Sequence, residues 1–151
     1  MEQEQTLVLL KPDAVLRGLC GKIITRFEQK GLKIVAMKFI EPSVSLVQAH
    51  YSAHKGKDFY DNLVTYMSNK PVIAMVVEGR SAVESVRTLC GATDPLKAQP
   101  GTIRGDFALK KTNVICNLVH ASDSVENAQK EIALFFTKNE CLRYERADQT
   151  F

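Results

Sequence analysis

One histidine stands where a strand-like segment gives way to a helix-like one. The apolar residues 114–116 lead toward His120, and apolar residues at helical spacing follow from Val125 onward. Between them, Asp123 and Glu126 have the spacing of a capping box, which marks a helix start. An imidazole beside the exposed amides of a helix start is well placed to meet an anion. The histidine could instead be a buried residue of a polar turn, and these few residues alone favour that simpler interpretation.

Polar residues elsewhere supply the groups that a polyphosphate needs. Outside the predicted core lie Lys11, Tyr51, Arg87, Thr93, Arg104 and Asn117. Cations neutralise phosphate charge and hydroxyl groups bind the remaining oxygens, and phosphoryl transfer requires little beyond such positioning. Phe59 could stack on a base. The two arginines could alternatively be structural salt-bridge partners.

Two common phosphate-binding loops are missing from the sequence. There is no G-x-x-x-x-G-K-[ST] string, and no G-x-G-x-x-G string follows a predicted strand. Neither a P-loop nor a protein-kinase loop therefore explains the polar set. A phosphoryl group would need another acceptor, and His120 is the natural nucleophile.

The composition is typical of one globular domain. The chain has 151 residues, of which 45% are hydrophobic and 25% charged, so we expect a single domain over residues 1–151. A net charge of +3 suits an anionic small molecule. The basic residues are scattered, and they predict neither a specific nucleic-acid site nor a membrane-binding arm.

The cysteines and the start of the chain indicate a cytoplasmic protein. The cysteines are Cys20, Cys90, Cys116 and Cys141, far apart and without metal-ligand spacing. We interpret them as reduced packing residues. Residues 1–5 are acidic and polar, unlike a secretory or transit signal, and no apolar run approaches the length of a membrane span.

Hydrophobic patterns predict an α+β fold. We expect strands at 6–10, 32–40, 72–77 and 107–119, helices at 18–30, 58–66 and 81–90, a helix after Ser43, a long helix after Ser124, and a long irregular loop at 92–105. This order predicts a ferredoxin-like βαββαβ sandwich, a four-stranded antiparallel sheet with an inserted helical hairpin and a long loop before the last strand. RNA-recognition modules share this core but need aromatic residues on the sheet, where this chain has aliphatic ones.

Six strings run through the chain in a fixed order. They are Lys11-Pro12-Asp13, Gly21-x-Ile23-Ile24-x-Arg26-Phe27-Glu28, His50-Tyr51, Pro71-Val72-x-Ala74-Met75-Val76, Pro100-Gly101-Thr102-Ile103-Arg104-Gly105-Asp106-Phe107 and Asn117-x-x-His120-x-Ser122-Asp123-Ser124. With these strings the chain resembles the nucleoside diphosphate kinase family from end to end. Each string alone is weak evidence, but the whole set in order is very specific.

The resemblance implies a role for each candidate residue. His120 would be phosphorylated on Nδ1 as a covalent intermediate, Glu131 would fix the ring tautomer by a hydrogen bond, and Ser122 would support them from behind. The phosphates would be held by Lys11, Tyr51, Arg87, Thr93 and Arg104, the ribose 3′-hydroxyl by Lys11 and Asn117, and the base by Phe59 with Leu63 beside it.

The resemblance also implies a reaction and its partners. A nucleoside triphosphate would donate its terminal phosphoryl group to His120, and a nucleoside diphosphate would then accept it, in a ping-pong mechanism. Mg²⁺ would bridge the nucleotide phosphates rather than sit in a protein cage. We expect a homo-oligomer, a hexamer rather than a tetramer. The alternative is a catalytically silent nucleotide-binding or scaffold protein on the same fold, but such a protein would have lost the histidine, Lys11 or the arginines.

Some positions depart from the family pattern. Ala121 replaces the usual glycine after the histidine, which could shift the turn slightly. The spacing from Asp106 to His120 is longer than usual, which suggests a longer turn around residues 110–113 and leaves Val114 as a guess for the far side of the base. His50 and His54 are predicted to be surface or hairpin histidines without a role.

Overall fold

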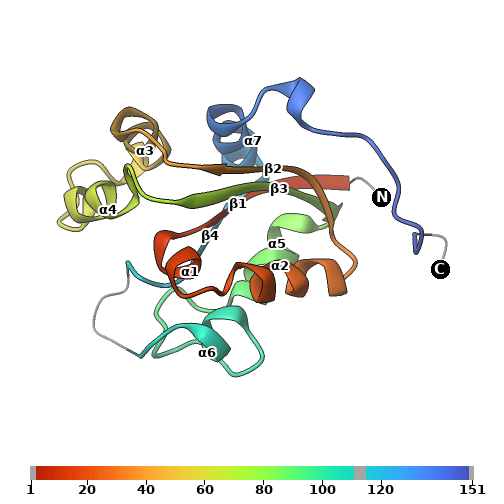
Figure 1. Ribbon diagram of the computed structural model, residues 1–151, viewed down its shortest axis with the longest axis horizontal. Helices are drawn as coiled ribbons and strands as arrows, with labels where there is room; N and C mark the ends of the chain where they lie inside the picture. The colour runs from red at the N-terminus through yellow and green to blue at the C-terminus, as the bar shows by residue number, and fades with distance from the viewer. Residues whose placement is uncertain (1–2, 111–114, 150–151) are drawn as a thin grey trace.

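In the computed structural model, which describes residues 3–110 and 115–149, a four-stranded antiparallel sheet is covered by helices on both faces (Figure 1). The strands are β1 (Gln3–Leu10), β2 (Lys33–Ile40), β3 (Val72–Arg80) and β4 (Val119–Ala121). Their order across the sheet is β2-β3-β1-β4. This arrangement confirms the predicted α+β, ferredoxin-like fold.

The helices follow the predicted order with two short additions. They are α1 (Pro12–Leu16), α2 (Cys20–Gln29), α3 (Val44–His50), α4 (Tyr60–Met67), α5 (Ala82–Cys90), α6 (Ile103–Phe107) and α7 (Val125–Phe135), with 3₁₀ turns η1 (Ser52–His54) and η2 (Lys138–Glu140). The pair α3 and α4 is the predicted hairpin between β2 and β3. The additions are α1, which begins at a proline, a favourable first residue for a helix, and α6.

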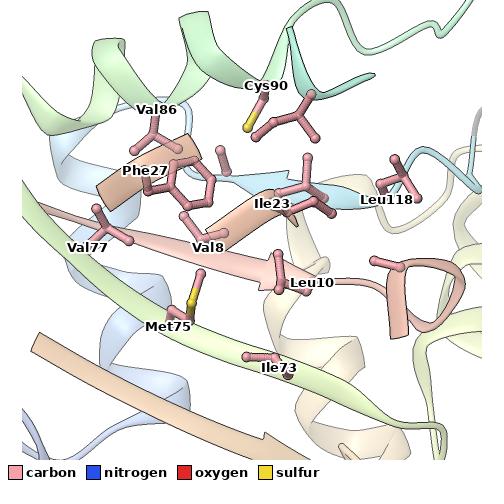
Figure 2. Packing of buried hydrophobic residues seen from close by; sticks show 14 of the residues in the cluster. Val8, Leu10, Ile23, Phe27, Ile73, Met75, Val77, Val86, Cys90 and Leu118 are labelled. Carbon is pink, nitrogen blue, oxygen red and sulfur yellow. The ribbon is translucent and has the colours of Figure 1, made fainter. Parts of the chain in front are cut away.

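The apolar strands are buried on both faces. In β1, Val8 and Leu10 pack with residues of α2 and α5, and Figure 2 shows this cluster. The alternate residues Leu7 and Leu9 pack on the other face with residues of α3, α4 and α7. Covering both faces explains why β1 and β3 are continuous apolar runs in the sequence.

The strand predicted at 107–119 is wrong. The chain forms α6 at Ile103–Phe107, where the Thr102 hydroxyl accepts a hydrogen bond from the Gly105 amide at 2.9 Å and caps the helix. Strand β4 begins only at Val119 and is three residues long. The predictions for residues 111–114, including the longer turn and Val114, lie outside the described residues.

The N-cap of α7 lies one residue after the predicted capping residue, Asp123. Ser124 is the N-cap, and its hydroxyl accepts a hydrogen bond from the Asn127 amide at 3.1 Å. Asp123 instead accepts a hydrogen bond from the side-chain amide of Asn127 at 2.6 Å. A serine cap serves the helix as well as an aspartate, so the helix starts where Ser124 allows it.

The register of the sheet places the candidate residues. Strand β4 pairs with the end of β1, and His120 lies opposite Leu9. Lys11 follows β1 directly, and its amide donates a hydrogen bond to the Leu118 carbonyl at 2.9 Å. The short β1–β4 ladder therefore brings the histidine and the lysine to the same end of the sheet.

The C-terminal segment follows the outer edge of the sheet. The Leu142 amide donates a hydrogen bond to the Val35 carbonyl at 2.9 Å, and Arg146 donates to the carbonyls of Glu28 and Leu32. The chain after η2 is thus docked on β2 and on the end of α2. Within the described ranges, no helix combines the length and apolar character that a membrane span needs.

Candidate active site

The predicted residues gather around one cavity of about 770 Å³. Its lining includes Lys11, Tyr51, Phe59, Leu63, Arg87, Thr93, Arg104, Asn117, His120 and Glu131. Ser122 is fully buried behind the wall. Residues that are far apart in the sequence thus share one pocket, and they come from the end of β1, the hairpin, α5, α6, β4 and α7.

A hydrogen bond to Glu131 orients the His120 ring. Nε2 of His120 lies 2.6 Å from Oε1 of Glu131. The Ser122 hydroxyl donates to the same carboxylate oxygen at 3.2 Å, and it accepts a hydrogen bond from the Leu7 amide at 3.2 Å. With Nε2 protonated and donating to Glu131, the neutral ring carries its lone pair on Nδ1. The tautomer therefore leaves the lone pair of Nδ1 available to an electrophile in the pocket.

The surroundings keep this ring neutral. Burial is the main reason that the pKa of His120 falls from 6.5 to about 3, and repulsion from Lys11, Arg104 and Arg87 lowers it further. Burial also raises the pKa of Glu131. The neutral, unprotonated Nδ1 is the form that can attack phosphorus.

Lys11 and Asn117 form a pair on the floor of the pocket. The Lys11 ammonium donates to Oδ1 of Asn117 at 2.8 Å and to the Ile115 carbonyl at 3.1 Å. The Asn117 side-chain amide donates in turn to the Thr93 carbonyl at 2.9 Å. Burial and the nearby Arg104 lower the pKa of Lys11 to about 8. An anion in the pocket would favour the charged form of this lysine.

The two arginines donate hydrogen bonds to backbone carbonyls. Arg104 donates from Nε to the Asn117 carbonyl at 3.2 Å, from Nη1 to Gly91 at 2.8 Å and from Nη2 to Val119 at 2.6 Å. Arg87 donates to the Ala121 carbonyl at 3.4 Å. Across residues 3–110 and 115–149, neither arginine pairs with a carboxylate within 4.0 Å. The described residues therefore give the salt-bridge alternative no support, and both arginines line the pocket.

Aromatic residues line the hairpin side of the pocket. Phe59, just before α4, is 42% exposed, so its ring is accessible to a ligand. The His54 ring lies 5.2 Å from Phe59 and 6.2 Å from Tyr51. Leu63, one turn along α4, is buried. The Tyr51 hydroxyl is buried without a hydrogen-bond partner in the described part of the chain, and a ligand oxygen could satisfy it.

Sequence reasoning missed His50. The residue lies on the hairpin, as predicted, but its side chain is only 1% exposed rather than on the surface. Its ring contacts the His120 ring edge-on with centroids 4.5 Å apart, and its Nδ1 lies 4.0 Å from Oε1 of Glu131. Helical spacing from Leu46 and Val47 was a signal for this burial, because it puts His50 on the apolar face of α3.

One cluster has the ligand types of a metal site. Donor atoms of His50, His120 and Glu131 lie within 4.8 Å of one another, the only such group that the described ranges contain. The three cations that lower the pKa of His120 would also repel a metal ion there. We therefore assign no metal to these residues.

The turn before α7 accommodates Ala121 without strain. Ala121 is not among the described residues with positive φ, although its position usually holds glycine in the family that the sequence resembles. The left-handed residue nearest in sequence is Leu118, with φ of 74°, and it lies before β4 rather than in this turn. Replacing glycine by alanine therefore requires no unusual backbone at position 121.

Comparisons with known proteins agree on one family. A family model described as nucleoside diphosphate kinase matches residues 4–141. A nucleoside diphosphate kinase from Pyrococcus abyssi is 57% identical over 99% of this chain and 94% of its own length. One from Archaeoglobus fulgidus is 52% identical over 97% of this chain and 95% of its own length.

Solved structures agree with the sequence relatives. A transition-state mimic of the nucleoside diphosphate kinase from Borrelia burgdorferi, with bound vanadate and ADP, has a TM-score of 0.92 and 41% identity, covering 97% of this chain and 94% of that one. A halophilic relative from Halobacterium salinarum, in complex with CDP, has a TM-score of 0.90 and 45% identity over 97% and 95% of the two chains.

The neutral histidines can be tested by their titration. We expect the Cε1 protons of His50 and His120 to keep neutral-imidazole chemical shifts from pH 8 down to pH 5 in NMR spectra, because burial lowers both pKa values to about 3. Unfolded histidines take up protons near pH 6.5. The free energy of unfolding should therefore fall as the pH drops below about 6.5, by up to about 1.4 kcal/mol per pH unit for each buried ring. A His120 signal that titrates near pH 6.5 would contradict this account.

Proposed function

The chain belongs to the nucleoside diphosphate kinase family, and from this premise we propose that it moves the terminal phosphoryl group of a nucleoside triphosphate to a nucleoside diphosphate through a phosphohistidine at His120. The observation that carries the proposal is the hydrogen bond of Nε2 to Glu131 at 2.6 Å, which leaves Nδ1 unprotonated in a pocket lined by cations. A nucleophile and its charge-neutralising groups are the parts that this chemistry needs.

The reaction has two half-reactions in one cleft. In the first, Nδ1 of His120 forms a bond to the terminal phosphorus while the bond from that phosphorus to the bridging oxygen breaks, and the nucleoside diphosphate leaves. The ring then carries positive charge, which the Glu131 carboxylate balances. In the second, an oxygen of another diphosphate attacks the same phosphorus and the phosphorus–nitrogen bond breaks. No proton has to be removed from the nucleophile.

The cations and hydroxyl groups of the pocket hold the phosphates. We assign this role to Lys11, Tyr51, Arg87, Thr93 and Arg104, with Lys11 and Asn117 also contacting the ribose 3′-hydroxyl. Arg104 is well fixed for this role, because three backbone carbonyls hold its guanidinium. Fixed cations stabilise the developing charge without reorganising during the reaction.

The base lies against the hairpin in this proposal. The exposed ring of Phe59 stacks on it, and Leu63 packs beside that ring in the same lining. Stacking uses the face of the base rather than its hydrogen-bonding edge. A pocket of this kind accepts different nucleosides.

Mg²⁺ enters with the nucleotide rather than in a site of its own. Two acidic residues line the described pocket, and both are already engaged. Glu131 is bound to His120 and Ser122, and Asp123 accepts from the Asn127 side chain. This donor set fits a cation that is held by phosphate oxygens and water. The ion would neutralise phosphate charge during transfer.

Three further proposals concern the extent of the domain, the oligomeric state and the location in the cell. Residues 1–151 form one catalytic domain, supported by a family match that spans nearly the whole chain. The protein forms a homo-oligomer, a hexamer rather than a tetramer, and the exposed Leu16 and Leu96, at 75% and 60%, are apolar surface that a neighbour could cover. A cytoplasmic location suits its four cysteines, which are far apart in the sequence and which we interpret as reduced packing residues. A silent scaffold is not favoured, because every residue of the chemical set is present.

Removing the nucleophile should separate binding from transfer. We expect His120→Ala to abolish labelling of the protein by [γ-³²P]ATP while ADP still binds, because the other pocket residues remain. The wild-type label should be acid-labile and alkali-stable, as a phosphohistidine is, and unlabelled GDP should chase it off. Labelling of the variant at the wild-type level would show that another residue accepts the phosphoryl group.

The stacking role of Phe59 predicts a loss that does not depend on the base. Phe59→Ala should weaken the binding of ADP, GDP, CDP and UDP alike, each on the order of tenfold, because stacking on an aromatic ring tolerates any base. Dissociation constants from isothermal titration calorimetry would measure this. A large loss for one nucleotide only would mean that Phe59 selects a base by some other contact.

A further inference from the structure

A strained turn lies directly before the proposed nucleophile. Leu118 is a fully buried leucine with φ of 74°, a backbone conformation that side chains other than glycine rarely adopt. The Val119 amide closes the turn by donating to the Asn117 carbonyl at 2.9 Å. Three-residue turns with positive φ are rare and strained. Such strain persists only where the surroundings enforce it.

The segment after β1 enforces this conformation from both sides of the residue. The Leu118 amide donates to Oδ2 of Asp13 at 3.0 Å. The Leu118 carbonyl accepts from the Lys11 amide at 2.9 Å. Both polar groups of the strained residue are therefore bound to one short segment at the start of α1. The Asp13 carboxylate is the side-chain part of this clamp.

Tyr66 fixes the second carboxylate oxygen of Asp13. Its hydroxyl donates to Oδ1 of Asp13 at 2.8 Å and accepts from the Asp13 amide at 2.9 Å. Burial and the nearby carboxylate raise the pKa of Tyr66, so the hydroxyl keeps its proton. Tyr66 belongs to α4, the helix that also carries Leu63. The chain Tyr66–Asp13–Leu118 thus connects the base side of the pocket to the turn beside His120.

We propose that Asp13 is a positioning residue for phosphoryl transfer, which holds Leu118 in its strained turn so that His120 and Asn117 keep their places, and that Tyr66 orients Asp13. The inference rests on the proposed function, because it concerns the geometry of that reaction. If the turn relaxed to negative φ, the chain between Asn117 and His120 would change direction. A shift of about 1 Å at reacting groups can lower a rate on the order of 100-fold.

The Asp13→Asn variant replaces one acceptor oxygen by an amide group and keeps the size of the side chain, so it tests the hydrogen bonds alone. An aspartate presents two acceptors, one for the Leu118 amide and one for the Tyr66 hydroxyl. An asparagine has one carbonyl oxygen, so its amide group must face one of the two partners. Asp13→Asn therefore weakens the clamp without creating a cavity. Tyr66→Phe removes only the hydroxyl group and is the second, milder variant.

A matched control comes from η2, which pairs with Lys38 of β2, at the opposite edge of the sheet from β4. Glu140 also accepts a backbone amide, from Thr137 at 2.7 Å, and pairs its other oxygen with the Lys38 ammonium at 2.7 Å. It does not line the pocket. Glu140→Gln thus makes the same chemical change, from acid to amide, in a clamp that the reaction does not use.

The experiment measures phosphoenzyme formation in a single turnover at saturating Mg-ATP, together with ADP affinity and the unfolding temperature. We expect Asp13→Asn to lower the saturated rate by between about 10- and 100-fold, and to lower ADP affinity by a smaller factor, because Asn117 contacts only the ribose in the proposed complex. Tyr66→Phe should lower it less. The double variant should be no slower than Asp13→Asn, because both changes disable one connected unit. Glu140→Gln should leave the rate unchanged.

Several results would overturn the inference. One is an Asp13→Asn protein that forms phosphoenzyme at the wild-type rate. Another is that Asp13→Asn and Glu140→Gln lower the unfolding temperature equally and also lower the rate equally. Asp13 would then be a purely structural residue. If Asp13→Asn does not fold, a wild-type rate in Tyr66→Phe has the same meaning. A wild-type protein that forms no phosphohistidine would instead refute the proposed function, so the two failures are distinct.

Discussion

His120 and Glu131 share a hydrogen bond of 2.6 Å in a pocket whose other charged groups are mostly cations. Burial and these cations disfavour a second proton on the ring, and the carboxylate holds the first proton on Nε2. The ring is therefore neutral, with a defined tautomer and a lone pair on Nδ1. The same cations that keep the nucleophile neutral are the groups that would bind the phosphates. In the proposed mechanism, one electrostatic arrangement thus serves both the nucleophile and its substrate.

Strand pairing, one tight turn and side-chain hydrogen bonds to the backbone together bring these groups into one pocket. The β1–β4 ladder sets His120 opposite Leu9 and brings the chain after β1 beside the turn before His120. The Leu118 turn then redirects the backbone, and Arg104 binds the carbonyls on either side of that turn, at Asn117 and Val119. Backbone carbonyls thus fix a cation, and the cation in turn fixes the backbone. Such mutual support is how an over-determined site keeps a strained residue in place.

Much of this arrangement could be predicted from the sequence. The apolar runs of β1 and β3 signal strands because both faces are covered, and the helices around Phe27 and Val86 follow from clear helical spacing. The polar residues left outside the core, from Lys11 to His120, are the ones that line the pocket. Residue type alone identifies these pocket residues, because the interior of a protein rarely holds so many cations and hydroxyl groups without a ligand to bind.

The rest depends on contacts between distant residues. The φ of Leu118 has no local signal, since position 118 itself is neither glycine nor asparagine, and the carboxylate that binds its amide is 105 positions away. The burial of His50 against His120 likewise requires the packing of α3 on α7. Residues 103–107 form a helix because Thr102 caps it, although the surrounding glycines and prolines favour an irregular loop. Local patterns identify the groups, and long-range packing decides their geometry.

The most direct measurement determines which nitrogen of His120 carries the phosphoryl group. The protein would be labelled with ¹⁵N-histidine, phosphorylated with Mg-ATP and examined by ¹⁵N and ³¹P NMR under alkaline conditions that preserve phosphohistidine. We predict one phosphohistidine whose phosphorus is coupled to Nδ1, with the Nε2 proton retained in its hydrogen bond. A phosphorus bound to Nε2, or to a residue other than His120, would contradict the account.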